Sequence, residues 1–236
     1  MNRASNGIAP TRKFHNLGIM TDIAPSLSAD TALTLLKVGV AVVGGYLLGS
    51  IPFGVIATRL GGAGDIRKVG SGNIGATNVL RTGRRDLAAI TLIGDGAKGA
   101  VAVLLAAWLL SPTTVPVFAG GAAFFGHLFP VWLKGKGGKG VATFFGVVLA
   151  VAWPVGLGAA AVWLLFAAVF RYSSLAALAA AAWTPVIFFA LHRATTATLW
   201  LAIVLAILIF IRHRQNIRRL IKNLEPRIGE KAPATP

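Results

Sequence analysis

The chain consists largely of long stretches that contain no charged residue. Runs without Asp, Glu, Lys or Arg cover residues 38–58, 99–133, 140–170, 172–192 and 194–211. A helix that crosses a bilayer needs about 20 mostly apolar residues, whereas a helix on a soluble protein keeps a polar stripe along one face. The runs have no such stripe, so the pattern predicts an all-α integral membrane protein.

The runs and the turns between them predict seven transmembrane helices. The run at residues 140–170 is too long for one ordinary helix. Trp153-Pro154, followed by Gly156 and Gly158, divides it into two, because proline removes a backbone donor and glycine loosens a helix. We therefore expect helices at residues 32–60, 86–110 and 117–133, two within 140–170, and two more at 173–191 and 195–212.

The charges in the loops predict how these helices are oriented. Residues 59–86, residues 134–140, the turn at Arg171 and the segment after Arg212 hold most of the Lys and Arg, whereas the turns on the other side hold only Arg193. Cytoplasmic loops are enriched in Lys and Arg. We therefore expect a cytoplasmic C-terminus, an outside N-terminus and cytoplasmic active-site loops. If the fourth and fifth helices were one, the loop at residues 134–140 and the basic C-terminal segment would lie on opposite sides of the membrane. The charge pattern therefore favours seven helices.

The chain divides into three expected regions. Residues 1–31 form a basic N-terminal extension, expected to be flexible, which lacks the basic, apolar and small-residue order of a secretory signal. Met20 within it is an alternative start. Residues 32–225 form the seven-helix membrane domain, and residues 226–236 form a C-terminal tail. The chain has no cysteine, which excludes disulfides and a thiol nucleophile.

Composition and charge narrow the class of protein and of partner. Of the 236 residues, 56% are hydrophobic and 13% are charged, against about 25% charged in an average soluble domain. These values exclude a disordered chain, a coiled coil and an ordinary water-soluble enzyme. The 23 Lys and Arg against 7 Asp and Glu give a formal charge of +16. In so apolar a chain this favours anionic membrane lipids or phosphorylated small molecules over nucleic acid.

The first basic loop, residues 65–81, combines glycines with small polar side chains and arginine. Its candidate functional residues are Ser71, Asn73, Thr77, Asn78 and Arg81. Glycines let backbone N–H groups approach a phosphate, and arginine is a bidentate clamp of permanent charge. A linker that served topology alone would not need this density of polar groups. We therefore predict an anion-binding loop.

The same loop also matches a dinucleotide-binding pattern. Gly70, Gly72 and Gly75 fit G-x-G-x-x-G. That interpretation requires a preceding strand within a βαβ unit, which two membrane helices do not provide. We therefore reject it.

The second basic loop is rich in both glycine and lysine. Its candidate substrate-binding residues are Lys136, Gly137, Gly138, Lys139, Gly140 and Thr143. Glycine amides, ammonium groups and the start of a helix together form an anion site. The loop is not a Walker A motif, because Val141 follows Gly140 where that motif has Lys. Topology alone would explain the lysines but not the glycines, so we predict phosphate binding.

The third basic element, residues 212–222, is expected to continue the seventh helix as an amphipathic helix. His213 and Asn216 are three positions apart and therefore share a face that can turn toward the loops. On the same side of the membrane, Ser173 and Ser174 add two hydroxyl groups. Arg214, Arg219 and Lys222 are assigned to lipid headgroups.

Three ionisable residues lie inside the expected helices. Asp95 and Lys98 are three positions apart. Such residues often mark a functional site, but here we favour a structural pair on one helical face. His127 is expected to be a buried, hydrogen-bonded histidine.

Taken together, these motifs resemble the bacterial acyl-phosphate:glycerol-3-phosphate acyltransferases, the PlsY family. The resemblance covers about residues 40–225, and the N-terminal extension has no counterpart. The stretches that carry it are Gly49-Ser-Ile-Pro-Phe-Gly54, Asp65-Ile-Arg to Asn78, Gly94-Asp-Gly-Ala-Lys-Gly99, Gly126-His-Leu-Phe-Pro130, Lys136-Gly-Gly-Lys-Gly-Val-Ala-Thr143 and His213-Arg-x-Asn-Ile217. Asn223 is a departure, since the family often has Gly there, although Asn tolerates a left-handed turn.

The resemblance implies an activity. The enzyme would transfer a fatty acyl group from acyl-phosphate to the sn-1 hydroxyl of glycerol 3-phosphate, giving lysophosphatidic acid and inorganic phosphate, the first acylation of phospholipid synthesis. It implies a multi-pass protein of the bacterial inner membrane. No cofactor is expected and no metal-binding residue is predicted. The implied partners are the two substrates, membrane lipids and the soluble enzyme that makes acyl-phosphate.

The resemblance also implies roles for individual residues. Ser71 and Arg81 match the essential pair of the first motif, Lys139 and its glycines match the glycerol-phosphate-binding motif, and His213 and Asn216 match the third motif. Glu225 matches the downstream acid of that motif. The base is left open between His213 and a substrate phosphate, and His213 is equally well explained as a structural donor. No His-x4-Asp signature follows His127, which argues against an acyl-CoA donor.

Two other functions fit part of the pattern. Basic, glycine-rich loops would also suit a transporter or channel for a phosphorylated anion, but transporters usually have inverted repeats and a site near the midplane. The polar residues of this chain instead gather on one face. A non-catalytic membrane scaffold would leave the Ser and Asn residues of the loops unexplained.

Overall fold

The computed structural model describes residues 28–111 and 113–230. The chain divides into two compact units, one up to Leu35 and one from Leu36 onward. The predicted extension up to residue 27, including Met20, and the tail from residue 231 lie outside the described residues. The predicted domain boundaries stay a prediction.

The described residues are helical, with short 3-10 turns in the loops. The two predicted anion-binding loops lie between α2 and α4, where the first includes the short helix α3, and between α5 and α6. The helices are α1 (Ala29–Gly49), α2 (Phe53–Leu60), α3 (Ala76–Val79), α4 (Arg85–Leu109), α5 (Val115–Leu128), α6 (Val141–Val151), α7 (Trp153–Phe170), α8 (Ser173–Ala190), α9 (Thr196–Arg212) and α10 (Arg214–Ile221), and the 3-10 turns are η1 (Ile66–Lys68), η2 (Leu80–Thr82) and η3 (Val131–Leu133).

The predicted class, an all-helical membrane protein, is confirmed. Within the described ranges, residues 29–60, 85–109, 115–133, 153–170 and 173–190 are long and apolar enough to cross a membrane, and the bent pair α9–α10 is a sixth possible span. The helix α6 has 11 residues and rises about 16 Å, against about 30 Å for a hydrocarbon core. Seven spans and their orientation therefore stay a prediction.

The first expected helix is interrupted, and the run at residues 140–170 is divided as expected. The first was expected to run unbroken through residues 32–60, but α1 ends at Gly49 and α2 begins at Phe53. Pro52 has no N–H to continue the ladder, so the chain breaks over Ser50–Pro52. The predicted division of residues 140–170 is confirmed, with the break at Ala152 and Pro154 in the first turn of α7.

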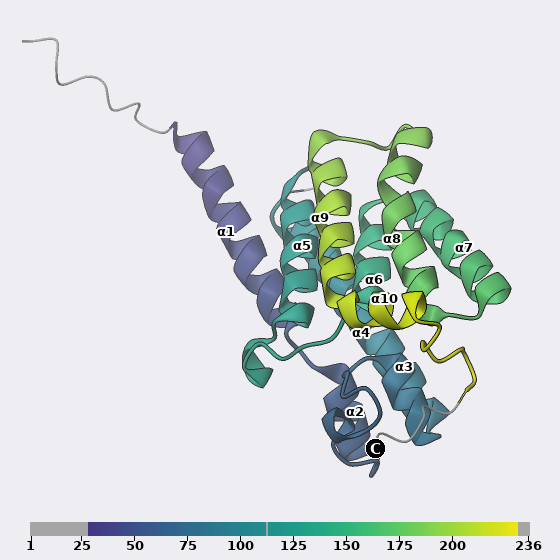
Figure 1. Ribbon diagram of the computed structural model, residues 1–236. Coiled ribbons are helices and arrows are strands. Elements are labelled where there is room, and N and C mark those ends of the chain that lie inside the picture. Colours follow the sequence, from purple (N-terminus) through teal and green to yellow (C-terminus); the bar gives the residue numbers. More distant parts are fainter. Residues whose placement is uncertain (1–27, 112, 231–236) are drawn as a thin grey trace, which may run out of the picture. The chain divides into compact units, whose positions relative to one another are not determined.

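The basic C-terminal element does not continue the seventh helix as expected. The axes of α9 and α10 differ by 62°, and His213 lies at the bend. In Figure 1, α10 crosses the ends of α9 and α8, with which it is in contact. The bend therefore turns α10 away from the axis of α9 and packs it against the protein, where Asn216 is buried.

The main core lies among α5, α6, α8 and α9. Its largest fully buried side chains include Phe124, Phe144 and Phe188. The helices α4 and α6 are closely packed. Gly146 permits this close approach, because a Cβ at that position would overlap the carbonyl group of Gly96. Small residues let membrane helices approach in this way. The packing fixes the start of α6, and with it the glycine-lysine loop that precedes it.

Candidate active site

Asn78 organises the first loop. It is buried, and its Nδ2 donates to the carbonyl groups of Ile66, Val69 and Asn73 at 3.2, 2.9 and 2.8 Å. Its Oδ1 accepts from the backbone N–H of Ser71 at 3.1 Å. One amide side chain therefore folds the whole loop around itself.

Asn78 also holds the two residues expected to act together. Its Oδ1 lies 3.3 Å from the hydroxyl of Ser71 and 3.4 Å from Nη1 of Arg81, which both donate to it. Gly70, at φ +55°, packs against this group, and a Cβ there would meet Asn78 Oδ1 and the Arg81 side chain. Ser71 is exposed and Arg81 is half-buried, so both remain open to a substrate.

The second loop is fastened at both of its faces. The backbone N–H groups of Gly137 and Gly138 donate to the carbonyl groups of Leu128 and His127 at the end of α5, at 3.2 and 3.1 Å. On the other side, Arg212 donates from Nη2 to the Gly137 carbonyl at 2.7 Å and from Nε to the Gly138 carbonyl at 3.0 Å. The N–H and the C=O of each of these two glycines are thus hydrogen-bonded to residues of neighbouring helices.

A chain of polar side chains joins the second loop to the C-terminal segment. Lys139 donates from Nζ to Oδ1 of Asn216, and Asn216 donates from Nδ2 to Oε1 of Glu225 at 2.5 Å. The hydroxyl of Ser174 donates to the same oxygen at 2.8 Å. The other oxygen, Oε2, lies 2.7 Å from Nε of Arg219. A single carboxylate therefore connects residues from the second loop, α8 and α10.

The local charge is strongly positive. Burial lowers the pKa of Lys139 to about 8; the nearby Glu225 opposes this shift, while Arg219, Arg81 and Arg212 add to it. Burial also lowers the pKa of Arg81, against the opposing effect of Glu225. These mutual effects show that the first loop lies within electrostatic reach of the other two elements. Three cations, Arg81, Lys139 and Arg219, interact with the one carboxylate of Glu225, and Arg212 adds a fourth positive charge near Lys139. This excess of positive charge favours binding of an anion.

Glu225 is held in its charged form. Burial raises its pKa, but the hydrogen bonds from Asn216, Ser174 and Arg219 outweigh burial and keep the pKa below its usual value. A charged Glu225 accepts from all three donors, so it fixes the positions of the surrounding groups.

His213 lies just past the last residue of α9 and is 2% exposed. Its Nδ1 is 2.8 Å from the carbonyl of Ile209, so Nδ1 carries the proton in the neutral ring. Burial, reinforced by Lys139, lowers the pKa of His213 to about 4. At neutral pH the histidine is therefore uncharged, with Nε2 as an acceptor.

The structure brings together most of the predicted residues, but not all. Thr143 is buried and its hydroxyl donates to the backbone carbonyl of Asp95 at 2.8 Å, so that hydroxyl serves packing between α4 and α6. Asn73 contributes its carbonyl to the loop of Asn78. Thr77 and Lys136 are exposed. Ser173 begins α8 beside Ser174, and Gly140, at φ +83°, precedes α6.

Two arginines belong to the cluster that sequence reasoning did not place there. The sequence assigns Arg219 to lipid headgroups, but its Nε lies 2.7 Å from the buried carboxylate of Glu225. Arg212 was not singled out, yet it holds two carbonyl groups of the glycine loop. A signal for Arg219 existed, because it lies three residues after Asn216 and so shares its helical face.

The ionisable residues inside the helices are largely as predicted. Asp95 and Lys98 form an ion pair at 2.7 Å, with side chains 2% and 1% exposed. His127 is buried, as predicted. It was also expected to be hydrogen-bonded, but its Nδ1 has no hydrogen-bond partner among the described residues and lies 3.5 Å from Asp95 Oδ1.

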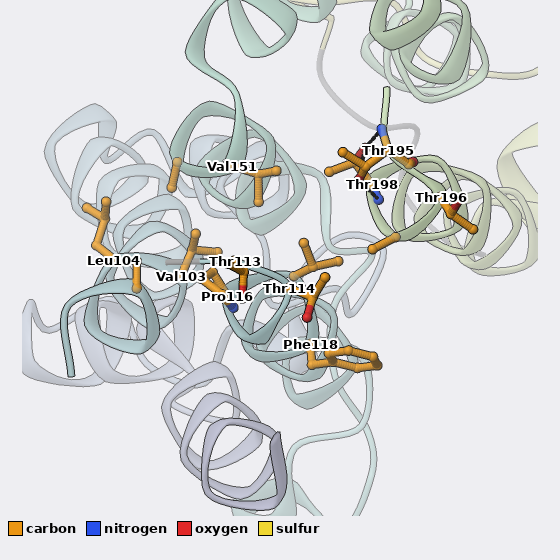
Figure 2. A pocket seen from close by; sticks show the side chains of 14 residues that line it. Val103, Leu104, Thr113, Thr114, Pro116, Phe118, Val151, Thr195, Thr196 and Thr198 are labelled. Carbon is orange, nitrogen blue, oxygen red and sulfur yellow. Dashed lines mark hydrogen bonds between the residues drawn. The ribbon is translucent and has the colours of Figure 1, made fainter. Parts of the chain in front are cut away.

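A separate apolar pocket lies at the ends of α5, α6 and α9 that are farther from the cationic cluster. Figure 2 shows it between the end of α4, the start of α5, the end of α6 and the start of α9, with a volume of about 790 Å³. Threonines, among them Thr113, Thr114 and Thr198, supply its polar atoms. None of the predicted site residues lines it, so it is distinct from the cationic cluster.

Comparison with known proteins agrees with this arrangement. Residues 39–223 match the glycerol-3-phosphate acyltransferase family. The chain is 63% identical over 204 residues to a glycerol-3-phosphate acyltransferase of Caulobacter vibrioides, covering 86% of this chain and 93% of that protein. It is 54% identical over 214 residues to one of Rhodospirillum rubrum, covering 88% and 98%.

Solved structures extend the similarity to the fold. The crystal structure of PlsY (YgiH), an integral membrane glycerol 3-phosphate acyltransferase, in its glycerol 3-phosphate form has a TM-score of 0.75 and 41% identity, covering 83% of this chain and 96% of that one. Its lysophosphatidic acid form has a TM-score of 0.74 and 38% identity, covering 81% and 95%. On sequence and fold together, the chain belongs to the PlsY family of glycerol-3-phosphate acyltransferases.

Proposed function

We propose that this protein transfers a fatty acyl group from acyl-phosphate to the sn-1 hydroxyl of glycerol 3-phosphate. The products are lysophosphatidic acid and inorganic phosphate. The single observation that carries this proposal is the cluster of Arg81, Lys139 and Arg219 around one carboxylate, Glu225, with Arg212 beside Lys139. Its excess of positive charge suits two phosphorylated substrates.

The two phosphates are assigned to different loops. Lys139, with the backbone of Gly137, Gly138 and Gly140, binds the phosphate of glycerol 3-phosphate, because ammonium and glycine amide groups at a helix start favour an anion. Arg81 binds the phosphate of the acyl donor, and Ser71 beside it orients the reacting group. Asn216 orients Lys139, to which it is hydrogen-bonded.

The chemistry requires no protein nucleophile. Acyl-phosphate is a mixed anhydride with a good leaving group, so the sn-1 oxygen attacks the acyl carbon, and the bond from that carbon to the phosphate oxygen breaks. The hydroxyl proton passes to Nε2 of His213 or to a substrate phosphate. Positioning and stabilisation of the developing charge supply most of the rate. The low pKa of His213 makes it a weak base and favours the phosphate.

We further propose seven spans, an outside N-terminus and a cytoplasmic C-terminus in the bacterial inner membrane. The distribution of Lys and Arg over the loops supports this orientation. The site then faces the cytoplasm, where glycerol 3-phosphate and the soluble enzyme that makes acyl-phosphate are found. The acyl chain of the donor stays among membrane lipids.

An assay of the purified protein in detergent tests the activity. Phosphate release from palmitoyl-phosphate is expected only when glycerol 3-phosphate is present, and palmitoyl-CoA is expected to be inert as donor. Two analogues test the position of transfer: 3-hydroxypropyl phosphate, which keeps the sn-1 hydroxyl, is expected to be acylated, and 1,2-propanediol 1-phosphate, which lacks it, is not. No phosphate release, together with anion flux in liposomes, would instead identify a transporter.

A further inference from the structure

A second polar cluster lies behind the glycine-lysine loop and is not used by the proposed chemistry. Lys98 donates from Nζ to Asp95 Oδ1 at 2.7 Å and to the backbone carbonyl of Ile51 at 2.8 Å. His127 lies on the other side of Asp95, with Nδ1 at 3.5 Å from Oδ1. The side chains of these three ionisable residues are 1–3% exposed. Burial of this kind prevents direct contact with a substrate.

Each member of this cluster touches a structure that the site depends on. Ile51 lies in the break between α1 and α2, and its carbonyl accepts from Lys98 Nζ at 2.8 Å and from the N–H of Phe53 at 3.2 Å. The helix α2 in turn packs on the first loop, because a Cβ at Gly54 would overlap the carbonyl of Ile74. Lys98 therefore connects α4 to the support of the first loop.

The other side of the cluster supports the second loop. The carbonyl of His127 accepts from the N–H of Gly138 at 3.1 Å, and a Cβ at Gly138 would overlap the ring of His127. The carbonyl of Asp95 accepts from the hydroxyl of Thr143, in the first turn of α6, at 2.8 Å. Lys139 lies between these two attachment points in the sequence.

We propose that Asp95, Lys98 and His127 form a positioning network, which sets the Lys139 loop and the α1–α2 break in the register that binds glycerol 3-phosphate. The network acts through the loops and does not touch the substrate. Lys98 donates to the carbonyl of Ile51, and Gly138 donates to the carbonyl of His127 and packs on its ring. A substitution in the network is therefore expected to displace both phosphate-binding loops. A small displacement of a positioned group is enough to reduce binding and rate.

The first test removes the charges without leaving one of them unpaired. Replacing a buried ion pair by apolar residues of similar volume is often neutral for stability, so the double variant Asp95→Leu, Lys98→Met is expected to fold. Its KM for glycerol 3-phosphate is expected to rise about tenfold, with a smaller change in kcat. Thr91→Val is the matched control, since Thr91 is buried one turn away in α4 and bonds only to its own helix. A folded double variant with parental KM would overturn the proposal.

A second pair of variants decides the question if the double variant does not fold. His127→Asn places an amide nitrogen where Nδ1 lies and keeps a polar group against Asp95, whereas His127→Leu does not. We expect the Asn variant to bind glycerol 3-phosphate several-fold more tightly than the Leu variant in calorimetry, because the Leu side chain leaves the buried Asp95 carboxylate without the polar neighbour that lies 3.5 Å away in the parent. Equal affinities would show that the polar contact is irrelevant.

These measurements rest on the proposed function but fail separately from it. If the parent protein neither binds glycerol 3-phosphate nor releases phosphate, the acyl-transfer proposal is wrong. If the parent is active and the variants keep its KM and affinity, only the positioning network is wrong.

Discussion

Lys139 donates a hydrogen bond to the amide oxygen of Asn216, 77 residues further along the chain. The same amide donates to Glu225 from its nitrogen. Asn216 therefore connects a cation that is expected to bind phosphate with the carboxylate that balances the cluster. No charged side chain could replace it, because the position requires an acceptor on one side and a donor on the other.

The first prediction follows from this dual role. Asn216→Ala leaves Lys139 and Glu225 without their shared partner, and unpaired buried groups cost about 1–3 kcal/mol each. We expect kcat/KM for glycerol 3-phosphate to fall about ten- to hundredfold. Gln215→Ala, at the exposed neighbouring position, is the control and is expected to keep parental kinetics. Equal activity of both variants would contradict the role of Asn216.

The second prediction concerns the pair of Arg219 and Glu225. Arg219→Ala removes one partner of a carboxylate that is 6% exposed, and turnover is expected to fall about tenfold, less than for a fully buried pair because Arg219 itself is 36% exposed. Arg218→Ala removes the adjacent, exposed arginine. If Arg219 served only lipid headgroups, both variants would behave alike in detergent.

The third prediction concerns pH. The pKa of Lys139 is lowered to about 8, so the side chain is charged below this pH and loses its proton above it. Because only the charged form attracts phosphate, kcat/KM for glycerol 3-phosphate is expected to fall as pH rises through about 8. In Lys139→Arg the falling limb is expected to move to higher pH, since arginine stays protonated. A profile unaffected by this substitution would assign the limb to another group.

The fourth prediction concerns the first loop. Asn78→Leu keeps a similar volume but removes the donor to three carbonyl groups. The melting temperature in detergent is expected to fall by about 5–10 °C, with loss of acyl transfer. Thr77→Ala, at an exposed position, is expected to leave the melting temperature unchanged. A parental melting temperature for Asn78→Leu would mean that the loop does not depend on this amide.

Helices of this chain could be predicted from sequence because their apolar runs reflect the bilayer itself, a strong and uniform constraint. The break at Ala152 was also predictable, since Pro154 marks it. The bend at His213 was not, because no proline or glycine occurs there and residues 212–222 read as one amphipathic helix. Tertiary contacts of α10 with α8 and α9 favour the bend over a straight continuation.

Part of the site also could not be predicted from sequence patterns. Lys139 and Asn216 were found because loops rich in polar groups are unusual in so apolar a chain. The contacts of Glu225 depend on the chain reversing at Asn223, which has φ +55°, and on the bond from the N–H of Ile228 to the carbonyl of Arg171 at 2.7 Å. These are long-range contacts, which no local periodicity encodes.

The shortness of α6 has a consequence for where the two substrates meet. Since its 11 residues rise about 16 Å, the glycine loop before it and the turn at Ala152 after it cannot both lie at the surfaces of a hydrocarbon layer of about 30 Å. If the loop is the end that is set below the surface, the protein works as a phase-transfer device. The water-soluble phosphate substrate would bind at the depth of the lipid-soluble acyl donor, and the donor would not have to leave the hydrocarbon layer.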